Sequence, residues 1–438
     1  MTRTVVDGVL VVYHRPAASW IKDASTVREH LHSFARHSRH RVWEVNVDIG
    51  FPKGLSALEF RAIILHYSVF GMGMYHLDDE WLGYLDGTEA FKVAFFQDEC
   101  TRCRRRFSFL NDHAIDCVYT CLEPSEFGKV YGRHTNVPQL VSNIPGYVSD
   151  KLVQAGRRFT VPRERRTVDV GYRGRPLPAY LGHGAMEKHE IGVRFGELAR
   201  GSGLRLDLAA GEHDRLYGDA WYRFMANCRC MLGVESGVSA FDLEDEVLDE
   251  YTRRRQQGLD VGLDDLQTLA RWEDAVYYRT ISPRHFEAAA LRVTQVLFEG
   301  RYSGVMEPMV HYIPLRKDFS NLDEVLSLIR DDDVCRELAE NAYRDLIASG
   351  EWSYARWVSG VDETLDQAID ARPAPAVEAT VKRQLSLDRA RQRRRRVASW
   401  AVRSILRLKP VRRAILFVHP VTSRIRRLLN IPGPDPVG

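Results

Sequence analysis

A carboxylate stands close to the start of a helical run late in the chain, directly after a short polar loop. Glu287 follows the loop Ser282–His285 and opens an Ala-rich stretch. A carboxylate can accept two hydrogen bonds from neighbouring hydroxyl groups, so Glu287 would suit a polyhydroxylated ligand. Alternatively, Glu287 is an ordinary first-turn glutamate, which the helix dipole favours. The residues alone leave both interpretations open.

Basic residues gather around a glycine turn in the middle of the chain. The run Gly171-Tyr-Arg-Gly-Arg175 follows a β-like segment, and Lys188 comes a short loop later. A glycine turn lets backbone amides approach a phosphate, and arginine or lysine neutralises a diphosphate leaving group as its charge develops. Arg173, Arg175 and Lys188 are therefore candidate diphosphate ligands. The alternative is a basic loop on the protein surface.

Polar side chains also follow apolar runs in the first third of the chain. Asp98 and Glu99 come just past the run Lys92–Gln97, where either carboxylate could act as a general base on an acceptor hydroxyl. Equally, either could cap the next helix. His14 and His66 occupy comparable positions, although a lone histidine is more often structural.

A turn of small residues, Gly233-Val-Glu-Ser-Gly237, follows another predicted strand. Its glycines and the Ser236 hydroxyl would allow a ligand to approach closely, with Glu235 as a neighbouring carboxylate. A simple turn explains the same residues equally well.

These residues must be positioned by strands that alternate with helices. The apolar runs predicted as strands in the first part are Val5–Tyr13, Arg41–Val47, Ala62–Tyr67, Lys92–Gln97 and Ala114–Cys121. Those predicted in the second part are Thr167–Tyr172, Arg205–Ala209, Cys230–Gly233 and Met309–Leu315. Parallel strands need long crossovers, so the alternation predicts an α/β fold with two doubly wound, Rossmann-like domains facing a cleft.

The expected boundaries follow the composition. We assign residues 1–155 to a first domain and 156–365 to a second domain, joined by the proline- and arginine-rich segment 157–166. The charged segment 242–268 is expected to be a helical excursion. Residues 366–438 are expected to form a linker and a basic amphipathic helical tail.

The tail differs sharply in charge from the rest of the chain. From Lys382 onward there are sixteen Lys or Arg and two acidic residues, a net charge of +14 in a chain whose total is +3. Interleaved Trp400, Ile405 and Phe417 favour an anionic membrane surface or an intramolecular docking helix. Nucleic-acid binding and a solvated extension are the alternatives, and nucleic acid is the less favoured partner.

Other segments restrict the cellular context. The first residues lack the apolar core and cleavage site of a signal peptide, and the longest apolar run in the tail, Ala414–Val418, is too short for a membrane span. We therefore expect a cytoplasmic protein, bound at most peripherally to the inner membrane face. Seven cysteines fit reduced thiols. Cys100, Cys103, Cys117 and Cys121 have zinc-like spacing, but the predicted strands separate them, so no metal site is expected.

Three short motifs resemble those of a known enzyme family. Pro283-Arg284-His285-Phe286-Glu287-Ala288 is similar to a loop of GT-B glycosyltransferases in the spore-coat-type, family-1-type group, although that loop has a spacer between Pro and Arg. Arg173-Gly-Arg-Pro-Leu-Pro178 with Glu187-Lys188, and Gln97-Asp-Glu99, resemble the same group. The resemblance implies that Arg284, His285 and Glu287 bind the donor. Many retaining members carry a second glutamate eight positions upstream of the Glu287 position, where this chain has Arg279.

The resemblance implies transfer of a sugar from a nucleotide-diphosphate-sugar co-substrate to a glycan, lipid-linked or protein acceptor. It makes residues 1–155 the acceptor-side domain and residues 156–365 the nucleotide-sugar-binding domain. It implies no bound metal and no other cofactor, because side chains and helix N-termini neutralise the diphosphate in such enzymes. With the tail, it predicts a role in bacterial surface polysaccharide or glycolipid assembly. The alternative is a non-catalytic carbohydrate- or nucleotide-binding protein that keeps the fold.

Overall fold

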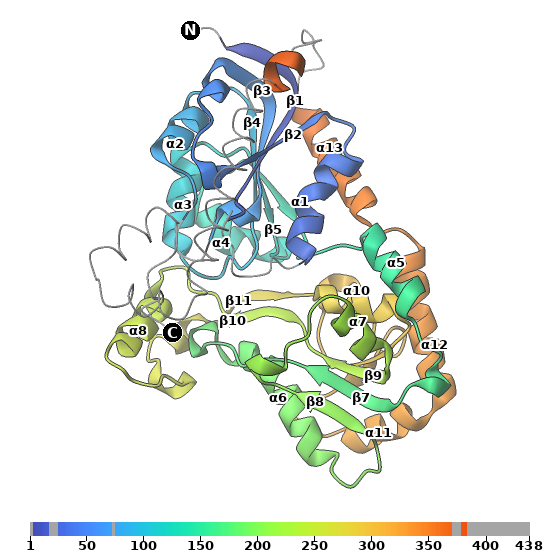
Figure 1. Ribbon diagram of the computed structural model, residues 1–438. Helices are drawn as coiled ribbons and strands as arrows, with labels where there is room; N and C mark the ends of the chain where they lie inside the picture. The colour runs from blue at the N-terminus through green and yellow to red at the C-terminus, as the bar shows by residue number, and fades with distance from the viewer. Residues whose placement is uncertain (1–2, 17–24, 72–74, 370–377, 383–438) are drawn as a thin grey trace, which may run out of the picture.

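The computed structural model describes residues 3–16, 25–71, 75–369 and 378–382, which form two parallel β-sheets covered by helices (Figure 1). This confirms the expected pair of Rossmann-like domains. The predicted helical tail from residue 383 onward lies outside the described residues. No helix among the described residues combines the length and apolar character needed to cross a membrane.

The first sheet has the strand order β2-β1-β3-β4-β5-β6, with every neighbouring pair parallel. Its strands are β1 (Thr4–Tyr13), β2 (Val42–Asn46), β3 (Leu58–Leu65), β4 (Phe91–Phe95), β5 (Cys117–Thr120) and β6 (Gln139–Ser142). The helices that follow these strands are α1 (Ser25–His37), α2 (Asp79–Asp86), α3 (Cys103–Asp112), α4 (Phe127–His134) and α5 (Asp150–Phe159).

Both faces of this sheet are covered because its central strands carry apolar side chains on both sides. On β1, Leu10 and Val12 belong to the core beneath α2 and α3, while Val9 and Val11 belong to a second core beneath α1. Successive side chains of a strand point to opposite faces, so one apolar run supplies both cores.

The second sheet has the order β13-β12-β9-β7-β8 and is also parallel throughout. Its strands are β7 (Val168–Arg173), β8 (Leu206–Ala209), β9 (Cys228–Gly233), β12 (Thr294–Phe298) and β13 (Ile313–Leu315). The helices of this domain are α6 (His183–Leu198), α7 (Asp219–Ala226), α10 (Pro283–Ala290), α11 (Leu322–Arg330) and α12 (Asp332–Tyr343).

An antiparallel ribbon joins the second domain to the first. It consists of β10 (Ser236–Ala240) and β11 (Glu273–Thr280), and the loop between them carries α8 (Glu246–Gln256) and α9 (Leu269–Trp272). The ribbon lies between the two sheets (Figure 1). Its apolar side chains Val238, Phe241, Val276 and Tyr278 are buried in the core of the first domain. The predicted helical excursion 242–268 is thus helical only in part, and it belongs to an interdomain arm.

The end of the described chain returns to the first domain. Helix α13 (Tyr354–Ala368) packs beside α1, where Trp357 and Val361 join the core beneath both helices (Figure 1). Residues 378–382 then place Val381 in the opposite core, and Arg41 donates a hydrogen bond to Glu378 at 2.7 Å. The first domain is therefore completed by residues from the far end of the chain.

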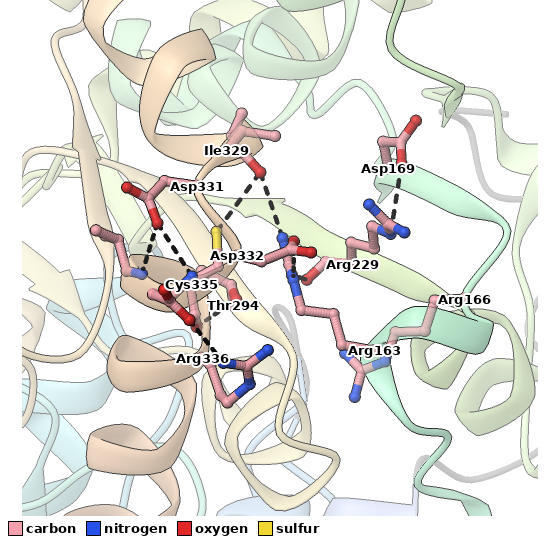
Figure 2. Close-up of polar contacts among 12 residues, drawn as sticks. Arg163, Arg166, Asp169, Arg229, Thr294, Ile329, Asp331, Asp332, Cys335 and Arg336 are labelled. Atoms are coloured by element: carbon pink, nitrogen blue, oxygen red, sulfur yellow. Dashed lines mark hydrogen bonds and ion pairs between the residues drawn. The ribbon is translucent and has the colours of Figure 1, made fainter.

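The segment between the two domains, residues 160–167, is held by hydrogen bonds against the end of the second sheet where β9 begins (Figure 2). Arg166 is buried and donates hydrogen bonds to the carbonyls of Cys228 and Leu291, at 3.1 and 3.2 Å. Arg163 donates to the carboxylate of Asp332 at 2.8 Å. The first residues of the predicted linker are helical, because α5 continues to Phe159.

The predicted strand Met309–Leu315 is mostly wrong. Only Ile313–Leu315 pairs as β13, because Met309 has a left-handed backbone (φ 56°) and a turn follows it. The strands β6, β10, β11 and β12 were not predicted. The other predicted strands are confirmed within a few residues of their ends.

Candidate functional site

An open cavity of about 250 Å³ lies at the carboxyl ends of β7 and β9. Strand β8 lies on one side of β7, and the chain then returns to place β9 on the other side. The carboxyl ends of β7 and β9 are therefore the topological switch point of the second sheet. Ligands of doubly wound sheets bind in such crevices. One wall is basic and is formed by Arg173, Arg175, Lys188 and Arg284. The rest of the lining is mainly apolar and includes Trp221, Met225, Met231, Leu232 and Ala288.

Arg173 ends β7 and is held in place from several sides. Its guanidinium donates to the Asp207 carboxylate at 2.8 Å and lies over the ring of Phe224, 4.0 Å from the ring centre. Arg175 lies two residues further on and is exposed at the rim. The structure therefore brings both predicted arginines to the same cavity, one fixed and one at its edge.

Lys188 has the most perturbed basic side chain of this wall. Burial, opposed by nearby Asp98 and reinforced by Arg284, Arg175 and Arg279, lowers the pKa of the Lys188 ammonium to about 8. No hydrogen-bond acceptor or ion-pair partner for this ammonium lies among the described residues. An anionic ligand would relieve the repulsion between these cations, so the wall is suited to a diphosphate.

Arg284 reaches the basic wall from the start of α10. Ser282 caps this helix by accepting from the Arg284 backbone N–H, and Pro283 stands at its first position. The Arg284 guanidinium donates to the Arg173 carbonyl at 2.5 Å and lies over the Trp221 indole, 5.3 Å from the ring centre. The predicted Arg284 is therefore adjacent to Arg173.

His285 lines the same cavity but is almost completely buried. Its Nε2 lies 3.2 Å from the Val234 carbonyl, and its Nδ1 lies 2.8 Å from the side-chain amide of Gln295. Burial lowers the pKa of His285 to about 4, so the ring is neutral at physiological pH. These contacts join α10 to the residue that follows β9 and to the second residue of β12.

Glu287 lies on α10 but not on the cavity wall. It is the fifth residue of the helix and not a first-turn residue, so the dipole explanation does not apply. Its carboxylate accepts a hydrogen bond from the Trp221 indole N–H at 2.8 Å, and burial raises its pKa.

The two polar residues of the turn after β9 lie in different surroundings. Ser236 lines the cavity, as expected of a residue near a ligand. Glu235 is buried, lies off the cavity wall, and accepts from the Tyr302 backbone N–H at 2.7 Å. The side chain of Tyr277 lies 3.3 Å from the same carboxylate, and burial raises the pKa of Glu235. The structure places Glu235 in a buried network behind the turn.

Asp98 and Glu99 point in different directions. Asp98 is exposed, has a left-handed backbone (φ 52°), and is close enough to raise the pKa of Lys188, which belongs to the other domain. Glu99 is fully buried and accepts from the Thr120 hydroxyl at 2.7 Å and the Cys121 backbone N–H at 2.8 Å. Tyr131 donates to the same carboxylate, and burial raises the pKa of Glu99. The expectation that Glu99 faces the cleft is therefore wrong.

Arg279, which stands where related enzymes carry a second glutamate, is paired within the second domain. It donates to Glu187 at 2.9 Å, and Lys317 donates to the other oxygen of the same carboxylate at 2.9 Å. Gly184 lies against the Arg279 guanidinium, since a Cβ there would come within 2.0 Å of it. Glu187 thus balances two cations beside the basic wall.

Several cavity residues were not recognised in the sequence, chiefly Trp221, Met225 and Gln295. Helical periodicity in the segment 218–226 would have placed Trp221 and Met225 on one face. His14 and His66 lie at the carboxyl edge of the first sheet, and neither lines this cavity. Among the described residues there is no group of three His, Cys, Asp or Glu side chains arranged to hold a metal ion.

The solved structures that resemble this chain are distant from it in sequence. No family model and no curated protein matches the sequence. Among solved structures, HepE from Anabaena in complex with UDP and glucose is 11% identical, with a TM-score of 0.45, over 83% of this chain and 100% of that one. An α-glucosyltransferase in complex with UDP and DNA is 10% identical, with a TM-score of 0.45, over 82% of this chain and 99% of that one. TarM is 11% identical, with a TM-score of 0.37, over 71% of this chain and 55% of that one. At this identity and TM-score these likenesses assign no activity. The sheet orders themselves describe two doubly wound α/β domains, as the sequence predicted.

Proposed function

We propose that the protein is a glycosyltransferase that moves a sugar from a nucleotide-diphosphate donor to a hydroxyl acceptor. The observation that carries this proposal is the basic wall of Arg173, Arg175, Lys188 and Arg284 at the switch point of the second sheet. Beside it the cavity has an apolar lining, which suits the base of a nucleotide. The motif resemblance of the same residues supports the assignment.

In this proposal the basic wall binds the diphosphate and stabilises the charge that develops on it as the glycosidic bond breaks. Arg173 is already fixed by Asp207 and Phe224, so part of the wall is organised before the donor arrives. Ser236 lies at the turn where the donor phosphate or sugar would pass. The buried His285 and Glu235 support the walls from behind.

Asp98 is the proposed acceptor-side base. It is exposed, belongs to the first domain, and lies near enough to Lys188 to act across the cleft. Glu99 takes no part in proton transfer here; its bonds to Thr120 and Cys121 hold the Asp98 loop. The acceptor is a glycan, a lipid-linked molecule or a protein.

The proposed cellular role is surface polysaccharide or glycolipid assembly at the inner face of the bacterial membrane. The net charge of +14 from Lys382 onward supports this role, because basic segments bind anionic membrane surfaces.

The test is to incubate the purified protein with UDP-, GDP- and dTDP-sugars and to measure donor hydrolysis and binding. We expect one donor class to bind and to hydrolyse slowly, and Lys188→Met to weaken binding of that donor. If none of the donors binds, the proposal is wrong. Glu340→Gln, at an exposed carboxylate on α12, serves as the control variant.

The second candidate is a non-catalytic nucleotide-sugar-binding protein. It is favoured by Arg279, because the paired carboxylates of many related enzymes are absent. The two functions differ in their response to Asp98→Asn. An enzyme would lose turnover while retaining donor affinity, whereas a binding protein would show no turnover in either form.

A further inference from the structure

Glu287 is hydrogen-bonded to a side chain of the donor cavity but does not line the cavity itself. Its carboxylate lies off the cavity wall, and its Oε2 accepts the hydrogen bond from the Trp221 indole N–H at 2.8 Å. Trp221 does line the cavity and is 9% exposed. The bond therefore fixes the orientation of an indole that forms part of the wall.

The same indole holds one member of the basic wall. The Arg284 guanidinium lies over the Trp221 ring, 5.3 Å from its centre, which is within the range of a cation–π interaction. From there it donates to the Arg173 carbonyl. A continuous series of contacts thus runs from Glu287 through Trp221 to Arg284 and the basic wall.

We infer that Glu287 is a positioning residue for diphosphate binding, acting through Trp221 on Arg284. This inference rests on the proposed function. It differs from the role that the motif resemblance implies, in which the Glu287 carboxylate contacts the donor directly. It also adds Trp221 to the residues that organise the donor site.

The physical reason is preorganisation. An exposed arginine loses rotamer freedom when it binds a phosphate, and this cost falls when the guanidinium is already held over an indole. The indole can do so only while it keeps its orientation, and the Glu287 hydrogen bond fixes that orientation. Losing the acceptor would release Trp221 and, with it, Arg284.

The charge of Glu287, taken alone, predicts that its removal changes anion affinity in the opposite direction. Removing a carboxylate near a basic wall raises the positive potential there, which by itself tightens anion binding. Positioning and charge are separated by two substitutions. Glu287→Gln removes the charge but keeps an oxygen that accepts the indole N–H, whereas Glu287→Ala removes both.

The probe is inorganic pyrophosphate, which has neither ribose nor base. Its affinity reports on the basic wall alone, so a residue that binds only the ribose cannot affect it. UDP is measured beside it by titration calorimetry on the full chain. The variants are Glu287→Ala, Glu287→Gln, Trp221→Phe and the double variant Trp221→Phe/Glu287→Ala, and Glu340→Gln is the matched surface control.

We expect Glu287→Ala and Trp221→Phe each to weaken pyrophosphate binding by about three- to tenfold. Glu287→Gln should remain within about twofold of the unaltered protein, because it rescues the hydrogen bond. The double variant should be no weaker than either single variant, because both changes break the same series of contacts. Thermal unfolding of each variant shows whether it is folded.

Three results would overturn the inference. One is unchanged pyrophosphate affinity in Glu287→Ala with weakened UDP binding, which indicates a direct ribose contact. Another is tighter pyrophosphate binding in both Glu287 variants, which indicates charge alone. The third is additive loss in the double variant. Failure of the unaltered protein to bind either probe would instead contradict the proposed function.

Discussion

The affinity of the donor site for a nucleotide-diphosphate sugar should fall as pH rises through about 8, because Lys188 loses its proton there. Burial and the neighbouring Arg284, Arg175 and Arg279 lower the pKa of this lysine to about 8. The phosphoryl groups of such a donor stay ionised across the range, so they add no titration of their own. A change in affinity would therefore report on the protein.

The size of the effect follows from that pKa. A lysine with a pKa of about 8 is roughly 90% charged at pH 7 and roughly 10% charged at pH 9. If only the charged form binds the diphosphate, the dissociation constant should rise about tenfold between these two pH values. Binding should also take up a proton near pH 8, because the bound anion raises the pKa of the lysine.

The assay is titration calorimetry with UDP-glucose, or the donor found to bind, at pH 6 to 9.5. Buffers of different ionisation enthalpy reveal the proton uptake. Lys188→Arg should flatten the profile, since arginine stays charged throughout. Asp98→Asn should move the profile to lower pH, because Asp98 raises the lysine pKa. An equally steep profile in Lys188→Arg would refute this reasoning.

Three further changes test how the site is supported, each by urea unfolding. Glu99→Ala should destabilise the protein by about 2–4 kcal/mol, because it leaves buried donors without their acceptor, whereas an effect below about 0.5 kcal/mol would contradict the burial of this carboxylate. Gly237→Ala should cost about 2–4 kcal/mol, since the new Cβ would lie 2.1 Å from the Tyr278 carbonyl at a φ of 97°, and a neutral effect would argue against this ribbon geometry. Arg166→Ala should cost about 2–3 kcal/mol, because the Cys228 and Leu291 carbonyls lose their donor; stability like that of the unaltered protein would show that other donors replace it.

The sequence predicted the two sheets because apolar runs alternate with helices. It failed where the local pattern is ambiguous. The strand β12, Thr294–Phe298, is wholly buried and shows no alternation, so it is hard to separate from the Ala-rich helix before it. Met309–Leu315 looks like a strand in composition, yet a left-handed residue and a turn occupy its first half.

The candidate site was predicted in part because the carboxyl ends of parallel strands identify its edge. Arg173, Arg175, Lys188 and Arg284 all reach the cavity. The sequence does not predict in which direction each side chain of a turn points. Asp98 and Glu99 are neighbours, and only the three-dimensional path of the loop decides that one is exposed and the other fully buried.

The position of Glu287 could have been predicted more closely. Ser282 and Pro283 are a typical helix start, so α10 begins four residues earlier than Glu287 and turns its carboxylate away from the first-turn N–H groups. Its partner Trp221 is distant in sequence. No local pattern connects the two residues.

The ribbon β10–β11 and the returning helix α13 affect the order in which the protein can be completed during synthesis. The first domain begins at the N-terminus, but part of its core consists of Phe241, Tyr278 and Trp357. A nascent chain that has reached only residue 155 lacks those side chains and leaves the corresponding apolar surface open. The core of the domain whose strands come earlier in the sequence is therefore completed by residues that are synthesised after most of the second domain.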